Sequence, residues 1–136
     1  MERGENEMCE QARFFICKHC GNIIGMIKDS GVPVVCCGEE MQELVANTVE
    51  ASQEKHIPVL EIEAEKVTVT VGSTIHPMMP EHHIEWIYLI TTNGRQRKCL
   101  AVDGEPKAIF FLAPGEKVIA AYELCNLHGL WKAENK

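Results

Sequence analysis

The chain has 136 residues and a formal net charge of −7, from 20 acidic and 13 basic side chains. This excess of negative charge argues against a general nucleic-acid binder, which would present a basic surface, and it means that an anionic substrate needs a local positive group. Hydrophobic residues make up 46% of the chain, enough for a core, but no run reaches the roughly 18–20 apolar residues of a membrane span.

Seven cysteines are a high and odd number for this length. Disulfide-stabilised secreted proteins favour even numbers and follow a signal peptide, whereas the stretch MERGENEMCEQARFF contains no apolar signal core. We therefore expect a reducing, cytoplasmic setting in which clustered cysteine and histidine side chains bind metal. Residues 1–12 are predicted to be a flexible extension, with Cys9 as a free thiol.

Residues 13–45 are predicted to form a small unit of three short strands separated by turns. A unit of this size buries too little apolar surface to fold unaided, so we expect a metal ion to hold it together. It contains Cys17-x-x-Cys20 and the adjacent pair Cys36-Cys37. Four sulfur ligands suit iron or zinc, and the sequence does not choose between them.

The adjacent pair needs a turn to bring both sulfurs to one ion, because neighbouring side chains on an extended strand point to opposite faces. Gly38 follows the pair and can supply that turn. A strained disulfide between Cys36 and Cys37 is the alternative, but it would leave the other two thiols without partners. His19, inside the first motif, is expected to be exposed.

Residues 46–55 are polar and are predicted to be a linker. From Ile57 onward the pattern is β, with valines alternating with threonines over 66–72 and an Asn93-Gly94 hairpin signal. Strands are predicted at 57–63, 66–72, 84–92, 95–102, 107–112, 117–124 and 130–133. Seven short strands at this spacing are typical of an immunoglobulin-like antiparallel β-sandwich, so the fold class is all-β, with a small metal unit followed by the sandwich.

Five of the six histidines fall at strand ends or in loops of the predicted sandwich. They are His56, His76, His82, His83 and His128. Scattered histidines are usually solvent-facing or hydrogen-bonded, but that does not explain five at strand ends, one of them three residues after Cys125. Four imidazoles and one thiolate would make a five-coordinate site with an open position opposite an electron-rich sulfur.

The motifs CKHCGN, VCCGEEM, EKHIPV, HPMMPEHHIEWI and CNLHGLWKAEN resemble those of the desulfoferrodoxins, the two-iron superoxide reductases. The resemblance extends from about Phe15 to Asn135, and both metal patterns occur in the family's order and spacing. It implies a desulforedoxin-type, rubredoxin-like FeS4 domain over 13–45, a catalytic superoxide reductase domain over 56–136, and a homodimer.

The resemblance also implies the ligands of two irons. Cys17, Cys20, Cys36 and Cys37 would hold the FeS4 centre, in which zinc is a possible substitute. The catalytic iron would be held equatorially by four histidines and axially by Cys125. These histidines would be His56, His76, His82 and His128. His82 is chosen over His83 because the family places its third histidine six residues after the second.

The implied activity is the one-electron reduction of superoxide to hydrogen peroxide. Lys55 would attract the anion and help to deliver protons, and Glu54 would ligate the oxidised iron until a rubredoxin or similar donor reduces it again. A two-iron electron carrier without substrate turnover is the alternative. Cys99, within a predicted strand, is expected to be a small buried residue, and no nucleic-acid or membrane partner is expected.

Overall fold

Short antiparallel strands account for nearly all the regular structure in the computed structural model, which describes residues 11–135. The chain forms two compact units, divided between Val45 and Ala46, and each is treated by itself. The expectations for residues 1–10, including the free thiol of Cys9, lie outside the described residues. Within residues 11–135, no helix has the length and apolar character that a membrane crossing requires.

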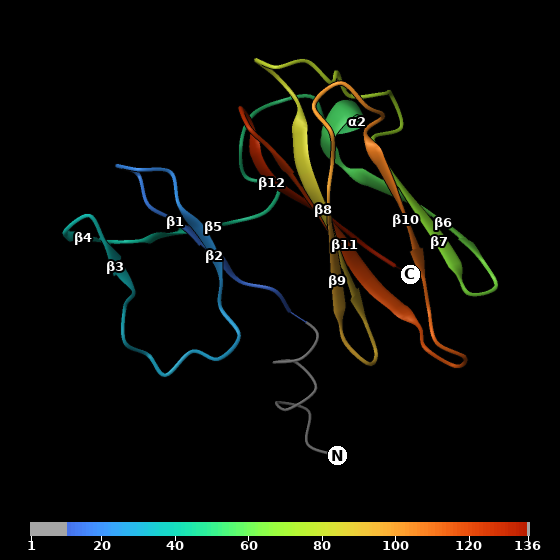
Figure 1. Cartoon of the computed structure of the whole chain (residues 1–136), viewed down its shortest axis with the longest axis horizontal. Coiled ribbons are helices and arrows are strands. Elements are labelled where there is room, and N and C mark those ends of the chain that lie inside the picture. The colour runs from blue at the N-terminus through green and yellow to red at the C-terminus, as the bar shows by residue number, and fades with distance from the viewer. Residues whose placement is uncertain (1–10, 136) are drawn as a thin grey trace. The chain divides into compact units, whose positions relative to one another are not determined.

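The first unit contains five very short strands (Figure 1). They are β1 (Phe14–Ile16), β2 (Ile23–Gly25), β3 (Val35–Cys36), β4 (Glu39–Glu40) and β5 (Gln42–Leu44). The order β2-β1-β5 makes a three-stranded sheet, and β3 and β4 make a separate hairpin. Arg13 ties this unit together, because its guanidinium contacts the carboxylates of Glu43 and Asp29. The prediction had only three strands here and missed β4 and β5.

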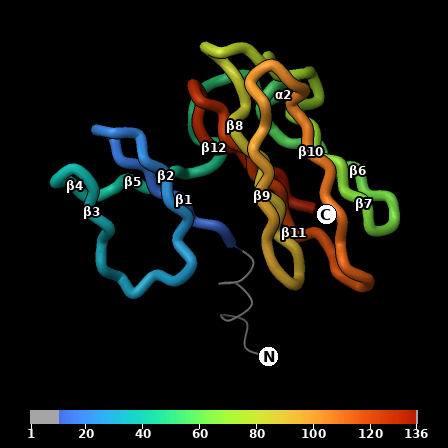
Figure 2. The backbone as a smooth tube through the Cα atoms, in the orientation of Figure 1, coloured from blue at the N-terminus to red at the C-terminus, as the bar shows by residue number. Residues whose placement is uncertain are grey.

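The second unit begins with a one-turn helix, α2 (Gln53–His56), and continues as seven strands. They are β6 (Pro58–Glu63), β7 (Lys66–Val71), β8 (Ile84–Thr91), β9 (Arg95–Cys99), β10 (Lys107–Phe111), β11 (Val118–Cys125) and β12 (Gly129–Glu134). Two antiparallel sheets, β10-β7-β6 and β12-β11-β8-β9, form the sandwich that Figure 2 traces. This confirms the all-β fold class and the seven predicted strands.

The sandwich core lies between the two sheets. Val67, Val69 and Val71 of β7 are completely buried, as their alternation with threonine predicted, and they pack with Ile87 and Leu89 of β8. Burial of each such side chain favours the folded state by about 1.5–3 kcal/mol. This core makes the sheets a rigid frame for the loops at their ends.

The edge strand β9 corrects one prediction. Lys98 reaches across to β10, where its amine contacts the carbonyl of Ile109 and lies 5.3 Å from the ring centroid of Phe110. Cys99, the next residue, therefore projects from the opposite face of the strand. There it is exposed and accepts a contact of 2.9 Å from Nη1 of Arg97. The prediction that Cys99 is buried is wrong, because its side chain points away from the sandwich core.

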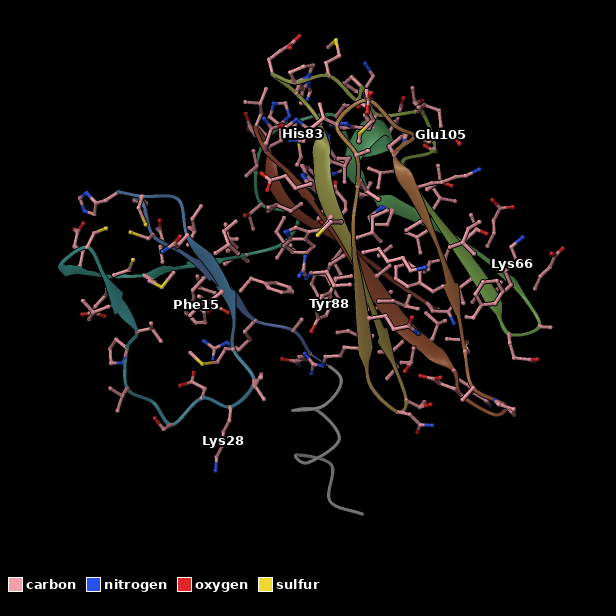
Figure 3. The ribbon with its side chains drawn as sticks, in the orientation of Figure 1. Phe15, Lys28, Lys66, His83, Tyr88 and Glu105 are labelled. Atoms are coloured by element: carbon pink, nitrogen blue, oxygen red, sulfur yellow. The ribbon has the colours of Figure 1, made fainter. Side chains whose placement is uncertain are left out.

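The end of the sandwich that carries α2 also carries the loop between β7 and β8 and the turn between β11 and β12. In Figure 3, His83 and Glu105 lie at this end, whereas Lys66 lies further toward the opposite end. Asn47, in the stretch predicted as a linker, is hydrogen-bonded to Leu130 and Lys132 of β12. The residues leading into α2 are thus attached to the sandwich.

Candidate metal centres

The four cysteines of the first unit come together as the spacing predicted. Their sulfur atoms all lie within 4.8 Å of one another, from Cys17 and Cys20 after β1 and from Cys36 and Cys37 at β3. The backbone takes left-handed conformations at Cys37 (φ 53°) and Gly38 (φ 78°). This double turn lets two adjacent cysteines face one point, where the sequence had predicted a turn at Gly38 alone.

The four thiols strongly influence one another's protonation. Hydrogen bonds from the backbone N–H groups of Cys20 and His19 lower the pKa of Cys17 to about 6. The neighbouring sulfurs of Cys17, Cys20 and Cys36 raise the pKa of Cys37 to about 12. Four thiolates this close repel one another unless a metal ion balances their charge. The donor set therefore fits iron or zinc.

His19 lies outside this sulfur cluster. It is exposed, as predicted, and its ring Nε2 contacts the carboxylate of Glu39. Because Glu39 follows the Cys36-Cys37-Gly38 turn, the contact joins the two cysteine-bearing loops. Asn22 adds a second link, since its Nδ2 lies 3.8 Å from Sγ of Cys36.

The second cluster gathers side chains from four places in the sandwich. His56 ends α2, His76 and His82 lie in the β7–β8 loop, and Cys125 ends β11. The ligand atoms of these four residues lie within 4.8 Å of one another. His128, in the β11–β12 turn, joins them: its Nδ1 is 3.2 Å from Nε2 of His56 and 3.9 Å from Sγ of Cys125.

Hydrogen bonds set which ring nitrogen of each histidine faces the cluster. Nδ1 of His56 donates to the carbonyl of Ser52 at 2.7 Å, and Nδ1 of His76 donates to the carbonyl of Pro77 at 2.7 Å. Both rings thus keep Nε2 for a ligand, the arrangement usual at metal sites. Nε2 of His82 is buried without a hydrogen-bond partner in the part of the chain that the structure describes. A buried nitrogen left in this state fits a bound metal ion.

The protonation of the histidines also suits metal binding. Burial lowers the pKa of His76 to about 4 and lowers the pKa values of His56 and His82. These three rings are therefore neutral near pH 7, the form that ligates metal.

Cys125 is buried at the base of the cluster, and burial raises its pKa. Hydrogen bonds from the backbone N–H groups of Leu127 and His128 act in the opposite direction, because they stabilise the thiolate. The C-x-x-H turn thus brings two donors to the sulfur of its own cysteine. Metal binding would supply the remaining stabilisation of the thiolate.

Glu54 and Lys55 are exposed on α2, beside the buried His56. The positive charge of Lys55 is among the influences that lower the pKa values of His56 and His82, so it lies close enough to act on the cluster. A hydroxyl of Thr74 lies 3.5 Å from the carboxylate of Glu54. The roles assigned to Glu54 and Lys55 stay predictions.

His83 is not a member of the cluster. Its ring Nδ1 lies 3.0 Å from the carbonyl of Met79, and its backbone is bound to Asn126. Asn126 accepts from the N–H of His83 at 2.8 Å and donates to the carbonyl of Glu81 at 3.1 Å. The side-chain amide of Asn126, the residue after Cys125, therefore contacts both sequence neighbours of His82. Sequence analysis missed this contact, for which the motif offers no local signal.

Two further residues beside the cluster were missed. Trp131 stacks on His56, and Glu123 is completely buried two residues before Cys125. Strand alternation places Glu123 and Cys125 on the same face of β11, which is the available sequence signal. Burial raises the pKa of Glu123 to about 9.

Comparison with known proteins places these clusters in a family. The family model described as Desulfoferrodoxin matches residues 48–134. A desulfoferrodoxin of Nitratidesulfovibrio vulgaris is 43% identical over 127 residues, covering 93% of this chain and 99% of the relative. A superoxide reductase of Pyrococcus horikoshii is 43% identical over 98 residues, covering 60% of this chain and 85% of the relative.

Among solved structures, the superoxide reductase from Treponema pallidum superposes with a TM-score of 0.78 at 43% identity. The superposition covers 91% of this chain and 99% of that one. The similarity therefore includes both units of the chain.

Proposed function

Because the chain belongs to the desulfoferrodoxin family, we propose that it is a superoxide reductase, which adds one electron and two protons to superoxide to give hydrogen peroxide. One observation carries the proposal: four imidazoles and one thiol converge at the end of the sandwich. They are His56, His76, His82, His128 and Cys125.

We infer that iron occupies both centres. The four thiols of the first unit would hold one ion, for which zinc is a possible substitute, and the five-ligand set would hold the other. Bound iron would supply the electron by changing between its ferrous and ferric states. Cys125 would supply a buried, electron-rich sulfur.

Lys55 is the residue that we propose draws superoxide to the site. The protein is acidic overall, so an anion approaches only where a local positive charge offsets the general repulsion. The ammonium group of Lys55 is exposed beside the cluster and can hold and orient a water molecule for proton delivery. Glu54, beside it, offers a carboxylate oxygen to the oxidised site.

We also propose a domain organisation, an oligomeric state and an electron donor for the chain. The domains are taken as 13–45 and 56–136, joined by 46–55 and preceded by an extension over 1–12. A homodimer is supported by the first unit, where Phe14 and Cys17 are the buried hydrophobic side chains among its described residues while Ile27 and Val32 are 99% and 70% exposed. A rubredoxin-like donor would return the electron. A cytoplasmic location would keep the clustered thiols reduced for metal binding.

The alternative, a two-iron electron carrier, is not favoured, because similar proteins are named superoxide reductases. A carrier would need no open coordination position. Adding azide or cyanide to the iron-loaded protein should change the visible spectrum of the His/Cys centre if a position is open, and an unchanged spectrum would support the carrier.

The activity itself is tested by mixing reduced, iron-loaded protein with superoxide generated by a radiation pulse. We expect one hydrogen peroxide per iron oxidised at the His/Cys centre and a slower reaction in Lys55→Ala. Lys66→Ala, which removes an exposed lysine from β7 (Figure 3), should react like the wild type. Equal rates in all three proteins would contradict the role of Lys55. A yield of only one peroxide per two superoxides, which spontaneous dismutation gives, with no iron oxidised at the His/Cys centre would contradict the function.

A further inference from the structure

The turn over residues 72–74, which follows β7, lies directly against the backbone of α2. A Cβ atom built on Gly72 would stand 2.5 Å from the carbonyl oxygen of Glu54, 3.0 Å from the carbonyl carbon of Lys55 and 3.1 Å from the carbonyl oxygen of Ile57. All three neighbours are backbone atoms, which cannot rotate away as a side chain does. The φ angle of Gly72 lies outside the left-handed region, so close approach is the reason that glycine is needed.

Hydrogen bonds reinforce the same contact. The carbonyl oxygen of Glu54 accepts from the N–H of Thr74 at 2.9 Å and from the hydroxyl of Ser73 at 3.3 Å. On its other side, the turn leads to His76, whose N–H donates to the carbonyl of Val71 at 3.0 Å. The turn therefore connects the backbone of α2 with a candidate metal ligand in the next loop.

α2 cannot hold its own position. It is a single turn, and an isolated helix of this length is unstable in water. Its sequence places Glu54, Lys55 and His56 in consecutive positions. The imidazole of His56 faces the metal cluster, but the directions of the two side chains before it depend on where the backbone of α2 lies.

We propose that Gly72 is a positioning residue for Lys55 and Glu54, an inference that rests on the proposed superoxide reductase function. A Cβ at position 72 would lie 2.5 Å from the carbonyl oxygen of Glu54, whereas ordinary van der Waals contact begins at 3.4 Å. The methyl group of alanine would therefore push the backbone of α2 away from the turn. A displacement of about 1 Å in a positioning element can slow a reaction about 10²-fold. The ammonium group of Lys55 would then be displaced relative to the metal cluster.

The test compares the wild type with Gly72→Ala and Gly94→Ala in the iron-loaded full chain. Gly94 is the matched control, because a Cβ there meets no atom of the described residues within 4 Å. We expect the rate constant with superoxide to fall at least about tenfold in Gly72→Ala. Its dependence on ionic strength should also weaken, because the steering charge is misplaced. Gly94→Ala should match the wild type in both measurements.

A second readout does not depend on activity. Amide hydrogen exchange of a peptide covering residues 52–58 should be faster in Gly72→Ala, since the hydrogen bond from Ile57 N–H to the carbonyl of Gln53 loses its support. If Gly72→Ala matches the wild type in rate constant, in salt dependence and in amide hydrogen exchange, the proposal is overturned. An inactive wild type would instead refute the function on which the proposal rests.

If Gly72→Ala does not fold or load iron, the double variant Ser73→Ala, Thr74→Val decides. It removes both hydroxyl contacts to Glu54 without crowding the backbone. A smaller fall in rate with weaker salt dependence supports the positioning role. Wild-type behaviour in this variant overturns it.

Discussion

The indole of Trp131 stacks on the imidazole of His56, with ring centroids 4.9 Å apart and planes inclined by 23°. The same indole donates its Nε1–H to the carbonyl of His128 at 3.1 Å. One completely buried side chain of β12 thus supports two candidate ligands that are separated by 72 residues. Its substitution should disturb both.

Two substitutions of Trp131 separate stacking from hydrogen bonding. Trp131→Phe keeps an aromatic ring on His56 but loses the bond to His128, which should lower the free energy of unfolding by about 1 kcal/mol. Trp131→Ala removes both and leaves a cavity, which should cost about 3–5 kcal/mol. Urea unfolding followed by circular dichroism measures the difference. Phe111→Ala, at an aromatic side chain that is 67% exposed, is the control and should change little.

Asn126 should control the position of His82 relative to Cys125. Asn126→Leu loses both amide contacts to the β7–β8 loop, whereas Asn126→Asp keeps an acceptor for the N–H of His83. Contacts that orient ligands typically affect metal affinity by about 10–100-fold. Competition with a chelator should therefore show the highest metal affinity in the wild type, a lower one in Asn126→Asp and the lowest in Asn126→Leu.

Asn135→Leu is the control for this ranking. It also removes an amide hydrogen bond from the sandwich, to the carbonyl of Val118, but not at the metal cluster. An equal loss of affinity in Asn135→Leu and Asn126→Leu would show that the effect is general destabilisation.

Glu123 should make the stability of the sandwich depend on pH. Burial raises its pKa to about 9 in the folded protein from an ordinary 4.5, and neither carboxylate oxygen has a hydrogen-bond partner among residues 11–135. Above pH 4.5 the unfolded chain therefore loses a proton that the folded chain keeps. The stability contribution of this group is complete below pH 4.5 and is lost as the pH rises to about 9, by at most about 1.4 kcal/mol per pH unit.

Glu123→Gln should remove this loss. In the metal-free protein, the variant and the wild type should have similar free energies of unfolding near pH 4.5, with the variant increasingly more stable toward pH 9. Tryptophan fluorescence follows the sandwich alone, because both tryptophans, Trp86 and Trp131, lie in it. A difference that stays constant with pH, as expected for the exposed Glu61→Gln, would contradict the assignment.

Cys17→Ser should uncouple the two centres. The first unit has little core, so loss of one sulfur ligand should abolish its metal binding and unfold it. Metal content should fall from two ions per chain to one, while the sandwich still forms hydrogen peroxide from superoxide. Cys99→Ser, at an exposed thiol outside both clusters, should keep both ions. A peroxide yield that falls in Cys17→Ser to one per two superoxides, as in spontaneous dismutation, would mean that turnover needs the first centre.

The strands and the ligands were predictable because each has a local signature. Alternation of valine and threonine marked β7, and Asn93-Gly94 marked the hairpin between β8 and β9. Cysteine and histidine are recognisable by their chemistry wherever they cluster. The short strands of the first unit lack such a pattern: β5 is mostly exposed and exists through its pairing with β1, from a distant part of the sequence.

The residues that orient the ligands could not be predicted from sequence. Asn126 and Gly72 act through backbone groups of other segments, and Trp131 stacks on His56 and donates to His128 from a different strand. Each role depends on which neighbours the fold brings near, which is a tertiary property. Cys99 shows the same limit, because an apolar residue in a strand is buried only if its face of the strand meets a core.

The distance along the chain between ligands has a consequence for assembly. Cys17 and Cys36 are separated by 19 residues, and His56 and His128 by 72. Closing the longer loop costs about 1 kcal/mol more entropy, and it also requires the sandwich strands to pair first. A nascent chain can therefore acquire its N-terminal ion early, whereas the His/Cys centre becomes available after β12 has joined its sheet. Iron limitation during synthesis would then leave chains that carry the first ion and lack the second.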